Sequence, residues 1–169
     1  AFKEKILFTD SSFLRVFNLN LIAGHQETCL SSPSSIIISE TTAIKLFGNN
    51  WREQSIPGET LAIDGHTPLV ITGVFTDIPE QSHFISHLFA SVPSGHSNWL
   101  SDKSKVYTYV LLTQHGKPDE LGRKLKIGRL KTTDENRKEQ IFLQPLSRIH
   151  LFSTFEDDNA RLGNIKNIY

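Results

Sequence analysis

The sequence predicts a mixed α+β fold with two lobes, and three patterns within its 169 residues support that prediction. Residues 36–47 pass from a β-branched run directly into a helix-like run. Residues 56–75 place a Pro-Gly turn ahead of two strand-like runs, which is the order of a hairpin. Residues 106–143 show strand, helix and strand patterns in turn, which is typical of a βαβ-like unit.

Composition indicates a folded chain with no excess charge. Hydrophobic residues make up 38% of the chain, whereas charged residues make up 21%, too few for a disordered polyelectrolyte. The 18 basic and 18 acidic residues cancel, so the totals favour neither a nucleic-acid partner nor an anionic membrane surface. Cys29 is the only cysteine, which excludes a disulfide within the chain.

The first predicted elements are a strand at residues 5–9 and a short helix at residues 13–17. The Asp-Ser-Ser sequence at residues 10–12 supplies side-chain oxygens suited to capping that helix. A short strand over residues 19–23 follows, and Gly24 favours a turn at its end.

Residues 36–48 carry, in order, the signals for a strand, a helix cap, a helix and a helix end. Residues 36–38 are three isoleucines, which favour a buried strand. Ser39 is a suitable N-cap for a helix over residues 40–47, and Gly48 is the residue type that most readily ends a helix.

A hairpin is predicted after this helix. A Pro-Gly pair lies at the centre of a turn over residues 56–60, where glycine accepts the positive φ of a type II turn. Strands are predicted at residues 61–63 and 69–75, joined by an Asp-Gly reversal at residues 64–65.

Signals for secondary structure are weak in residues 80–104 and become clear again from residue 106. Residues 80–104 are rich in Ser, His and Gly, so we expect an irregular excursion with one short element at residues 84–92. A strand is predicted at residues 106–112, a helix at residues 119–127 and a further strand at residues 141–143.

Two histidines raise the possibility of a metal site. His83 and His87 are four residues apart and therefore share a face of a helix or a strand, as zinc ligation requires. His96 or Asp77 would complete such a site. No Glu lies between the two histidines as in helical metalloproteases, and apolar neighbours favour ordinary packing, so we assign no metal and keep this pair as the alternative.

No catalytic residue is predicted. The Ser-rich turns at residues 31–35 and 91–97 lack the Gly-x-Ser-x-Gly pattern that exposes a nucleophile. The acidic pair at residues 157–158 lies in an apparent linker, where nothing would separate the pKa values of its two carboxyl groups. The chain has no glycine-rich phosphate loop ending in Gly-Lys-Ser/Thr, so no cofactor is expected in this domain.

Three aromatic residues are the candidates for contact with a partner protein. Trp51, Trp99 and Phe152 lie in loop-like stretches, and aromatic side chains often dominate protein interfaces. The alternative for each is a hydrophobic lid over a small core.

An ordered set of segments carries a family resemblance. The segments are residues 10–24, 36–48, 56–61, 70–79 and 143–151. In that order they resemble the periplasmic core domain of MacB/FtsX-type ABC transporter permeases, over about residues 7–150.

The resemblance implies a two-lobed domain. Residues 1–80 would form a small α/β lobe, called Sabre in the family, and residues 81–155 a porter-like βαβ lobe that lacks its N-terminal part. Residues 156–169 would be a linker toward a transmembrane helix.

The resemblance also implies a function and its partners. The domain would lie on the periplasmic face of the bacterial inner membrane and have no catalytic activity. It would couple ATP hydrolysis at a separate cytoplasmic ATPase to efflux, lipoprotein handling or activation of an envelope partner by mechanotransmission. Its partners would be the helices of its own permease, the ABC ATPase, a periplasmic adaptor or envelope protein and a second permease copy, with no nucleic acid.

Two other functions remain open at this stage. One is a stand-alone extracytoplasmic binding or adhesion module. The other is a zinc-dependent hydrolase that uses His83 and His87.

Overall fold

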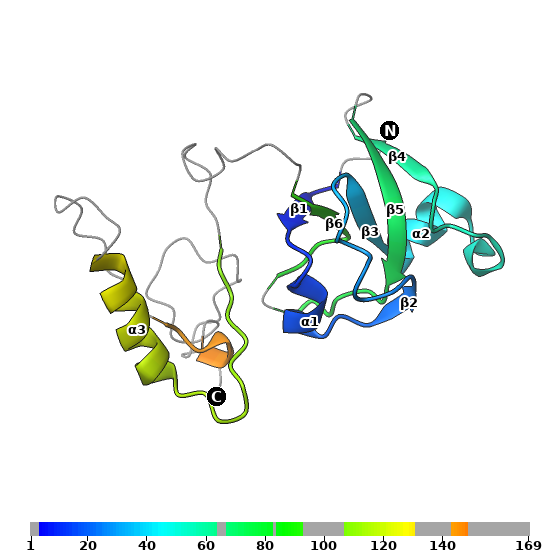
Figure 1. Ribbon diagram of the computed structural model, residues 1–169. Coiled ribbons are helices and arrows are strands. Elements are labelled where there is room, and N and C mark those ends of the chain that lie inside the picture. Colours follow the sequence, from blue (N-terminus) through cyan, green and yellow to red (C-terminus); the bar gives the residue numbers. More distant parts are fainter. Residues whose placement is uncertain (1–3, 64–66, 83, 93–106, 131–142, 149–169) are drawn as a thin grey trace, which may run out of the picture. The chain divides into compact units, whose positions relative to one another are not determined.

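The computed structural model describes residues 4–63, 67–82, 84–92, 107–130 and 143–148 (Figure 1). The chain divides into two compact units, residues 1–109 and residues 110–169.

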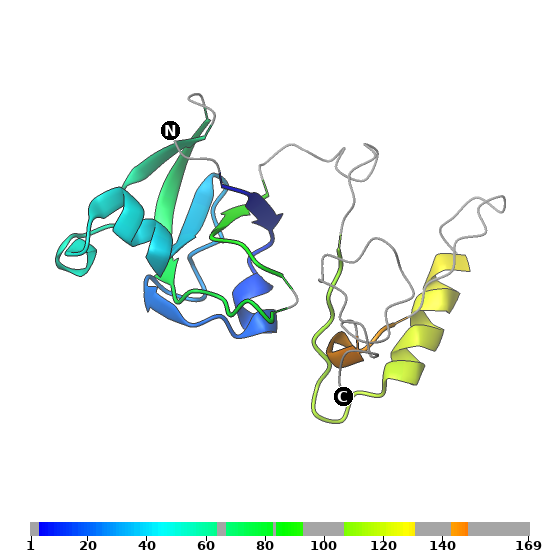
Figure 2. The same ribbon diagram turned by 180° about the vertical axis from the view of Figure 1, so that it is seen from behind.

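The first unit is built on a mixed sheet of six strands. These are β1 (Ile6–Thr9), β2 (Leu21–Ala23), β3 (Ser35–Ser39), β4 (Thr60–Ile63), β5 (Thr67–Phe75) and β6 (Leu88–Ser91). The strand order is β1-β6-β3-β5-β2, and β4 pairs with β5 outside this path. The β1–β6 and β3–β5 pairs are parallel, and the other pairs are antiparallel. Figure 2 shows the same unit from behind.

The predicted strand, cap, helix and glycine end are confirmed. Every residue of β3 is buried, and the Ser39 side chain caps α2 (Glu40–Phe47) by accepting a hydrogen bond from the Thr42 amide. Gly48 follows the helix with a φ of 85°, a backbone conformation that side chains disfavour. A 3-10 helix, η1 (Trp51–Glu53), comes next.

The first helix, α1 (Phe13–Phe17), also lies where the sequence predicts it. Its N-cap residue Ser12 makes no side-chain capping bond. Instead, the Asp10 carboxylate accepts hydrogen bonds from the Ser12 amide at 2.8 Å and the Ser12 hydroxyl at 2.6 Å. Asp10 therefore forms the turn that leads into α1.

The predicted hairpin is present as β4 and β5, with Thr60 opposite Val70 and Ile63 opposite Thr67. The turn before it is closed by a 3.0 Å hydrogen bond from the Glu59 amide to the Ile56 carbonyl. Gly58 has a φ of 110°, as the Pro-Gly sequence predicts.

Two hydrophobic clusters cover the two faces of the sheet. Alternate residues of a strand point to opposite faces, so Ile36 and Ile38 belong to one cluster and Ile37 to the other. The first cluster includes Trp51 from η1, and the second is rich in phenylalanine. The sheet is therefore a packed central layer.

The irregular stretch after the hairpin contains β6, which the sequence suggests only as a short element near residues 84–92. β6 lies between β1 and β3, so it is part of the first unit. The division between the units falls after Tyr109, whereas the sequence-based boundary falls after residue 80. The chain leaves the sheet at the end of β5 and returns to it at β6, and that long-range pairing has no local sequence signal.

The second unit contains α3 (Pro118–Leu130) and η3 (Leu146–Arg148). The helix predicted at residues 119–127 lies within α3 and is confirmed. The strand predicted at residues 106–112 is wrong for its described part, because residues 107–112 are neither strand nor helix. Most of the strand predicted at residues 141–143 lies outside the described residues.

The βαβ order is therefore not formed by the described residues of the second unit. A strand requires a neighbouring strand for its hydrogen bonds, and the described part of this unit contains none. Val110 and Leu111 are 51% and 61% exposed. Within the described residues, no helix has both the length and the apolar character needed to cross a bilayer.

Candidate functional site

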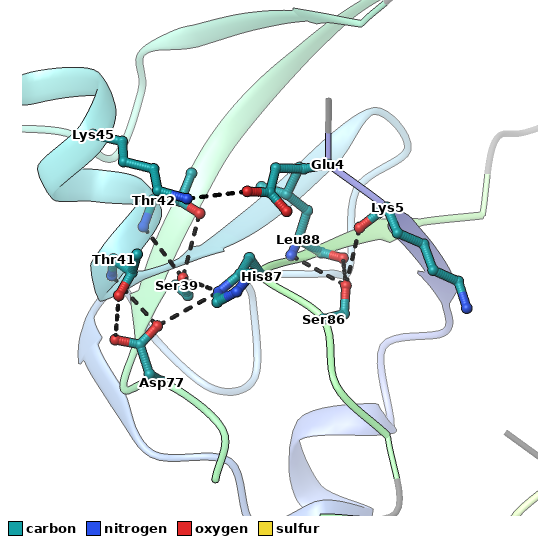
Figure 3. Close-up of polar contacts among 10 residues, drawn as sticks. All are labelled: Glu4, Lys5, Ser39, Thr41, Thr42, Lys45, Asp77, Ser86, His87 and Leu88. Carbon is teal, nitrogen blue, oxygen red and sulfur yellow. Dashed lines mark hydrogen bonds and ion pairs between the residues drawn. The ribbon is translucent and has the colours of Figure 1, made fainter. Parts of the chain in front are cut away.

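A polar cluster at the N-terminus of α2 is the strongest candidate site in the described part of the chain (Figure 3). It joins Ser39, Thr41, Asp77 and His87. β3 and β5 are parallel, so their carboxyl ends meet, and Asp77 lies two residues after the end of β5. β6 runs antiparallel to β3, so His87, which precedes β6, reaches the same end of the sheet.

Ser39 and His87 are linked twice. The Ser39 hydroxyl is hydrogen-bonded to His87 Nδ1 at 3.0 Å, and the Ser39 amide donates to the His87 carbonyl at 2.8 Å. The same hydroxyl oxygen accepts the capping bond from the Thr42 amide at 3.2 Å. Ser39 is fully buried, so its hydroxyl is committed to these bonds.

Asp77 joins the cluster through Thr41. The Asp77 carboxylate accepts a hydrogen bond from the Thr41 hydroxyl at 2.8 Å and a longer one, 3.4 Å, from the Thr41 amide. Its Oδ1 atom lies 3.6 Å from His87 Nδ1. A carboxylate at a helix N-terminus is favourable because the free amides there carry partial positive charge.

The cluster has the residue types of a serine hydrolase but lacks its geometry. In a catalytic triad, one ring nitrogen of histidine faces the serine and the other faces the carboxylate. Here His87 Nδ1 faces both Ser39 and Asp77, at 3.0 Å and 3.6 Å. A relay through the ring is therefore absent, and Ser39 is not accessible to a substrate.

The contacts of the cluster connect separate elements of the fold. Asp77 and His87 are the two ends of the excursion between β5 and β6, and both are bound to the N-terminus of α2. Next to His87, the Ser86 hydroxyl lies 3.1 Å from the Lys5 carbonyl and 2.9 Å from that of Leu88, which ties β1 to β6. The cluster thus closes one end of the sheet.

The alternative of a metal site at His83 and His87 is not tested by the described residues. His83 and His96 lie outside the described residues, so the pairing of His83 with His87 has no structural outcome. Within the described residues, no group of three or more His, Cys, Asp or Glu side chains is placed to hold a metal ion.

One of the predicted partner-contact residues lies in the core. Trp51 is only 4% exposed and packs in the first hydrophobic cluster. The guanidinium of Arg52 lies 5.3 Å from the centre of its ring. A ring so buried has little surface to offer a partner, which favours the alternative of a lid over the core, and partner contact by Trp51 stays a prediction. Trp99 and Phe152 lie outside the described residues.

Cys29 is a packing residue that sequence reasoning did not single out. Its thiol donates a hydrogen bond to the Thr72 carbonyl at 3.1 Å, and the Thr72 hydroxyl donates back to the Cys29 carbonyl. A Cβ atom on Gly24 or Gly73 would come within 2.7 or 2.8 Å of its sulfur. Burial raises the pKa of the Cys29 thiol, so the group stays protonated and unreactive near neutral pH.

A polar recess with a volume of about 500 Å³ lies beside α1. It is lined by Ser11, Ser12, Arg15, Gln26 and Glu27. None of these side chains is buried. The recess therefore lacks the desolvated groups that give catalytic side chains shifted pKa values.

Comparisons with known proteins give one family and one fold. The family model of the MacB-like periplasmic core domain matches residues 3–127. A domain of a predicted permease protein from Porphyromonas gingivalis has a TM-score of 0.60 and 24% identity, covering 80% of this chain and 57% of that chain. The periplasmic region of MacB from Actinobacillus actinomycetemcomitans has a TM-score of 0.47 and 16% identity, covering 75% of this chain and 55% of that chain. No curated protein matches the chain significantly.

These comparisons bear on two predictions from the sequence. The family match covers well over half of the 169 residues and confirms the resemblance carried by the ordered segments. The structural match to the Porphyromonas gingivalis domain confirms the mixed α+β fold class. The chain spans 57% and 55% of the two solved domains.

Proposed function

Because this chain belongs to the family of MacB-like periplasmic core domains, we propose that it transmits movement within an ABC transporter permease and performs no chemistry itself. ATP is bound and hydrolysed at a separate cytoplasmic ATPase. The resulting movement of the membrane helices reaches this domain on the periplasmic side, where it drives export, lipoprotein handling or activation of an envelope partner.

One observation supports the non-catalytic part of the proposal. The polar cluster at the N-terminus of α2 combines a serine, a histidine and a carboxylate, yet one ring nitrogen serves both neighbours. Its members fasten strands and a helix to one another, which suits a body that moves as a unit. The sequence also lacks a phosphate-binding loop, so ATP chemistry belongs elsewhere.

The partners follow from this role. They are the transmembrane helices of the same permease, the ABC ATPase, an adaptor or envelope protein in the periplasm and a second copy of the permease.

The test removes the domain from the full-length permease while keeping the membrane part. Residues 4–148 are replaced by a flexible Gly/Ser linker, and the variant is reconstituted with its ATPase in lipid vesicles. We expect ATP hydrolysis to persist within a factor of about three, whereas transport or partner activation falls by about tenfold or more. Normal transport without the domain would contradict the proposal.

A second arm tests the absence of chemistry. The 169-residue chain is incubated with ester and peptide substrates, alone and with added zinc. We expect no hydrolysis above buffer. Turnover that disappears in Ser39→Ala, or turnover that requires zinc and disappears in His87→Ala, would show an enzyme instead.

A further inference from the structure

One residue of β5 lies opposite no residue of a neighbouring strand in the described sheet. On one edge of β5, two consecutive residues of β3 face Ile71 and Gly73, so the register skips Thr72. On the other edge, β4 pairs with residues 67–70 and β2 pairs with residues 74–75 (Figure 1). Thr72 is therefore the extra residue of a β-bulge, at the place where β5 changes neighbours from β4 to β2.

The loop between β2 and β3 supplies hydrogen bonds to this bulge. A bulge interrupts the regular bonds of a sheet, so the polar groups of the extra residue need other partners. The Cys29 thiol donates to the Thr72 carbonyl at 3.1 Å, and the Thr72 hydroxyl donates to the Cys29 carbonyl. The Thr72 hydroxyl also lies 3.2 Å from the carbonyl of Ile36 in β3. Thr72 is thus tied to the loop by two reciprocal bonds.

Two glycines make room for this pair. A Cβ atom on Gly24 would lie 2.5 Å from the Thr72 carbonyl oxygen, and a Cβ atom on Gly73 would lie 2.8 Å from the Cys29 sulfur. Both distances are too short for a side chain. The loop, the end of β2 and the bulge therefore pack this closely because both positions are glycine.

The part of β5 before the bulge is held mainly by the hairpin. Among the described strands, residues 67–69 pair only with β4, since the register with β3 begins at Val70. The turn before β4 is joined to β5 by two backbone bonds. The Gly58 amide donates to the Ile71 carbonyl at 2.7 Å, and the Ile71 amide donates to the Glu59 carbonyl at 2.8 Å.

The part of β5 after the bulge is held by the rest of the sheet and by α2. It lies between β3 and β2, and the Thr76 amide donates to the Asn20 carbonyl at 3.0 Å. Asp77 then accepts a hydrogen bond from the Thr41 hydroxyl at the start of α2. The bulge is therefore the joint between the hairpin and the end of the sheet that carries the polar cluster.

We propose that the Thr72–Cys29 pair braces this bulge, so that the β4–β5 hairpin and the N-terminus of α2 move as one body. Without the brace, the hairpin would open or bend at Thr72 while the remainder of β5 stayed paired with β2 and β3. With the brace, a displacement of the hairpin is passed along β5 to Asp77. Such a connection would serve the proposed transmission of movement, but the brace itself does not depend on that function.

The brace differs from an ordinary stabilising contact in what its loss releases. An ordinary core contact would weaken the whole first unit when it is removed. Loss of the brace should release the hairpin alone, because the part of β5 after the bulge keeps its bonds to β2, β3 and α2.

The test is amide hydrogen exchange in the 169-residue chain. Thr72→Val replaces the hydroxyl by a methyl group of similar size and leaves the Cys29 carbonyl without that donor. We expect the Gly58 and Ile71 amides to exchange about tenfold faster, whereas the Thr76 amide should change by about twofold or less. The control is Thr60→Val, at an exposed position of the same hairpin, and it should match the unsubstituted chain.

Two further variants separate the hydroxyl from the rest of the side chain. Thr72→Ser keeps the donor, so exchange at Gly58 and Ile71 should stay slow. Cys29→Ala removes the thiol donor and should release the same two amides as Thr72→Val does. If Thr72→Val does not fold, Cys29→Ala provides the same comparison.

Four results would overturn the brace. One is unchanged exchange at Gly58 and Ile71 in both Thr72→Val and Cys29→Ala, and another is an equal rise at Thr76 and throughout β3. An equal rise in Thr60→Val would show that the hairpin responds to any lost threonine. Unfolding of both variants would make the pair a contact on which the whole unit depends. Exchange is read without transport, so each result leaves the proposed function standing.

Discussion

Two stretches of similar composition differ in burial and in secondary structure. Residues 36–38 and residues 110–112 are both short runs of large aliphatic side chains. The first run is fully buried in β3, between β5 and β6. In the second run, Val110, Leu111 and Leu112 are 51%, 61% and 36% exposed and belong to no strand.

The difference lies in the neighbours and not in the runs themselves. A strand is stabilised by hydrogen bonds and side chains supplied by other strands, so its propensity is realised only where partners exist. β3 has partners on both edges. Helices differ from strands in this respect, because their backbone hydrogen bonds are made within the helix itself. Accordingly, α2 and α3 both lie where the sequence predicts helices.

The largest expected effect separates these two runs. Ile37→Ala removes a fully buried side chain from β3 and should lower the free energy of unfolding by about 3 kcal/mol. Leu111→Ala should change it by about 0.5 kcal/mol or less, because the side chain is already in water. Urea unfolding followed by circular dichroism measures both. Equal losses would show that residues 110–112 are packed as tightly as β3, and the comparison would fail.

The same logic explains how far the sequence could predict the fold. Caps, turns and helix ends are local, so Ser39, Gly48 and Gly58 have the roles that their residue types indicate. β6 is recognised only in part, because what makes it a central strand is pairing with β1 and with β3. No local pattern encodes which strands will meet.

The candidate site shows the same limit. Ser39 is recognisable as a helix cap from its position alone. Its partner His87 is 48 residues away in sequence, and the meeting depends on the return of the chain at β6. For Cys29, one usable signal was Gly73 inside a predicted strand, since a strand glycine often marks a close approach.

The next prediction compares a glycine in each unit. A Cβ on Gly24 would lie 2.5 Å from the Thr72 carbonyl oxygen, and its φ is +92°, so Gly24→Ala should cost about 2 kcal/mol or more. Among the described residues, a Cβ built on Gly122 in α3 meets no atom within 4 Å beyond its chain neighbours and the backbone of its own helix. Gly122→Ala should therefore stabilise the helix by up to about 1 kcal/mol.

Thermal unfolding and helix content measure this pair of variants. The expected signs are opposite, a loss for Gly24→Ala and a gain for Gly122→Ala. Destabilisation by Gly122→Ala would mean that α3 packs closely on that side, and the second unit would then be as well ordered as the first.

A smaller effect compares two helix starts within the first unit. Ser39→Ala removes a buried capping bond and should cost about 1 to 2 kcal/mol. Ser12→Ala removes a hydroxyl that makes no capping bond, and the change should be about 0.5 kcal/mol or less. Urea unfolding gives both values, and amide exchange at Thr42 reports the cap itself. If the two substitutions lowered the free energy of unfolding by similar amounts, the capping bond of Ser39 would stabilise the protein no more than the exposed hydroxyl of Ser12 does.

The smallest effect concerns the pH dependence of stability through Cys29. Burial raises the pKa of its thiol above the ordinary value for a cysteine, so at alkaline pH the unfolded chain loses this proton before the folded protein does. The contribution of the protonated Cys29 thiol to the free energy of unfolding is therefore fully present below about pH 9.0. It is lost as the pH rises from there through the pKa of the thiol in the folded protein.

The measurement is the free energy of unfolding at pH 8 and at pH 10 for the unsubstituted chain and for Cys29→Ala. The unsubstituted chain should lose more stability over this range, because Cys29→Ala has no thiol to ionise. A thiol reagent should also react with Cys29 only slowly at pH 8 and rapidly in urea, since the sulfur is enclosed by Gly24, Gly73 and Thr72. Fast reaction in the folded protein would mean that the sulfur is accessible to solvent, and the packing around Cys29 would then be as loose as that of the exposed residues 110–112.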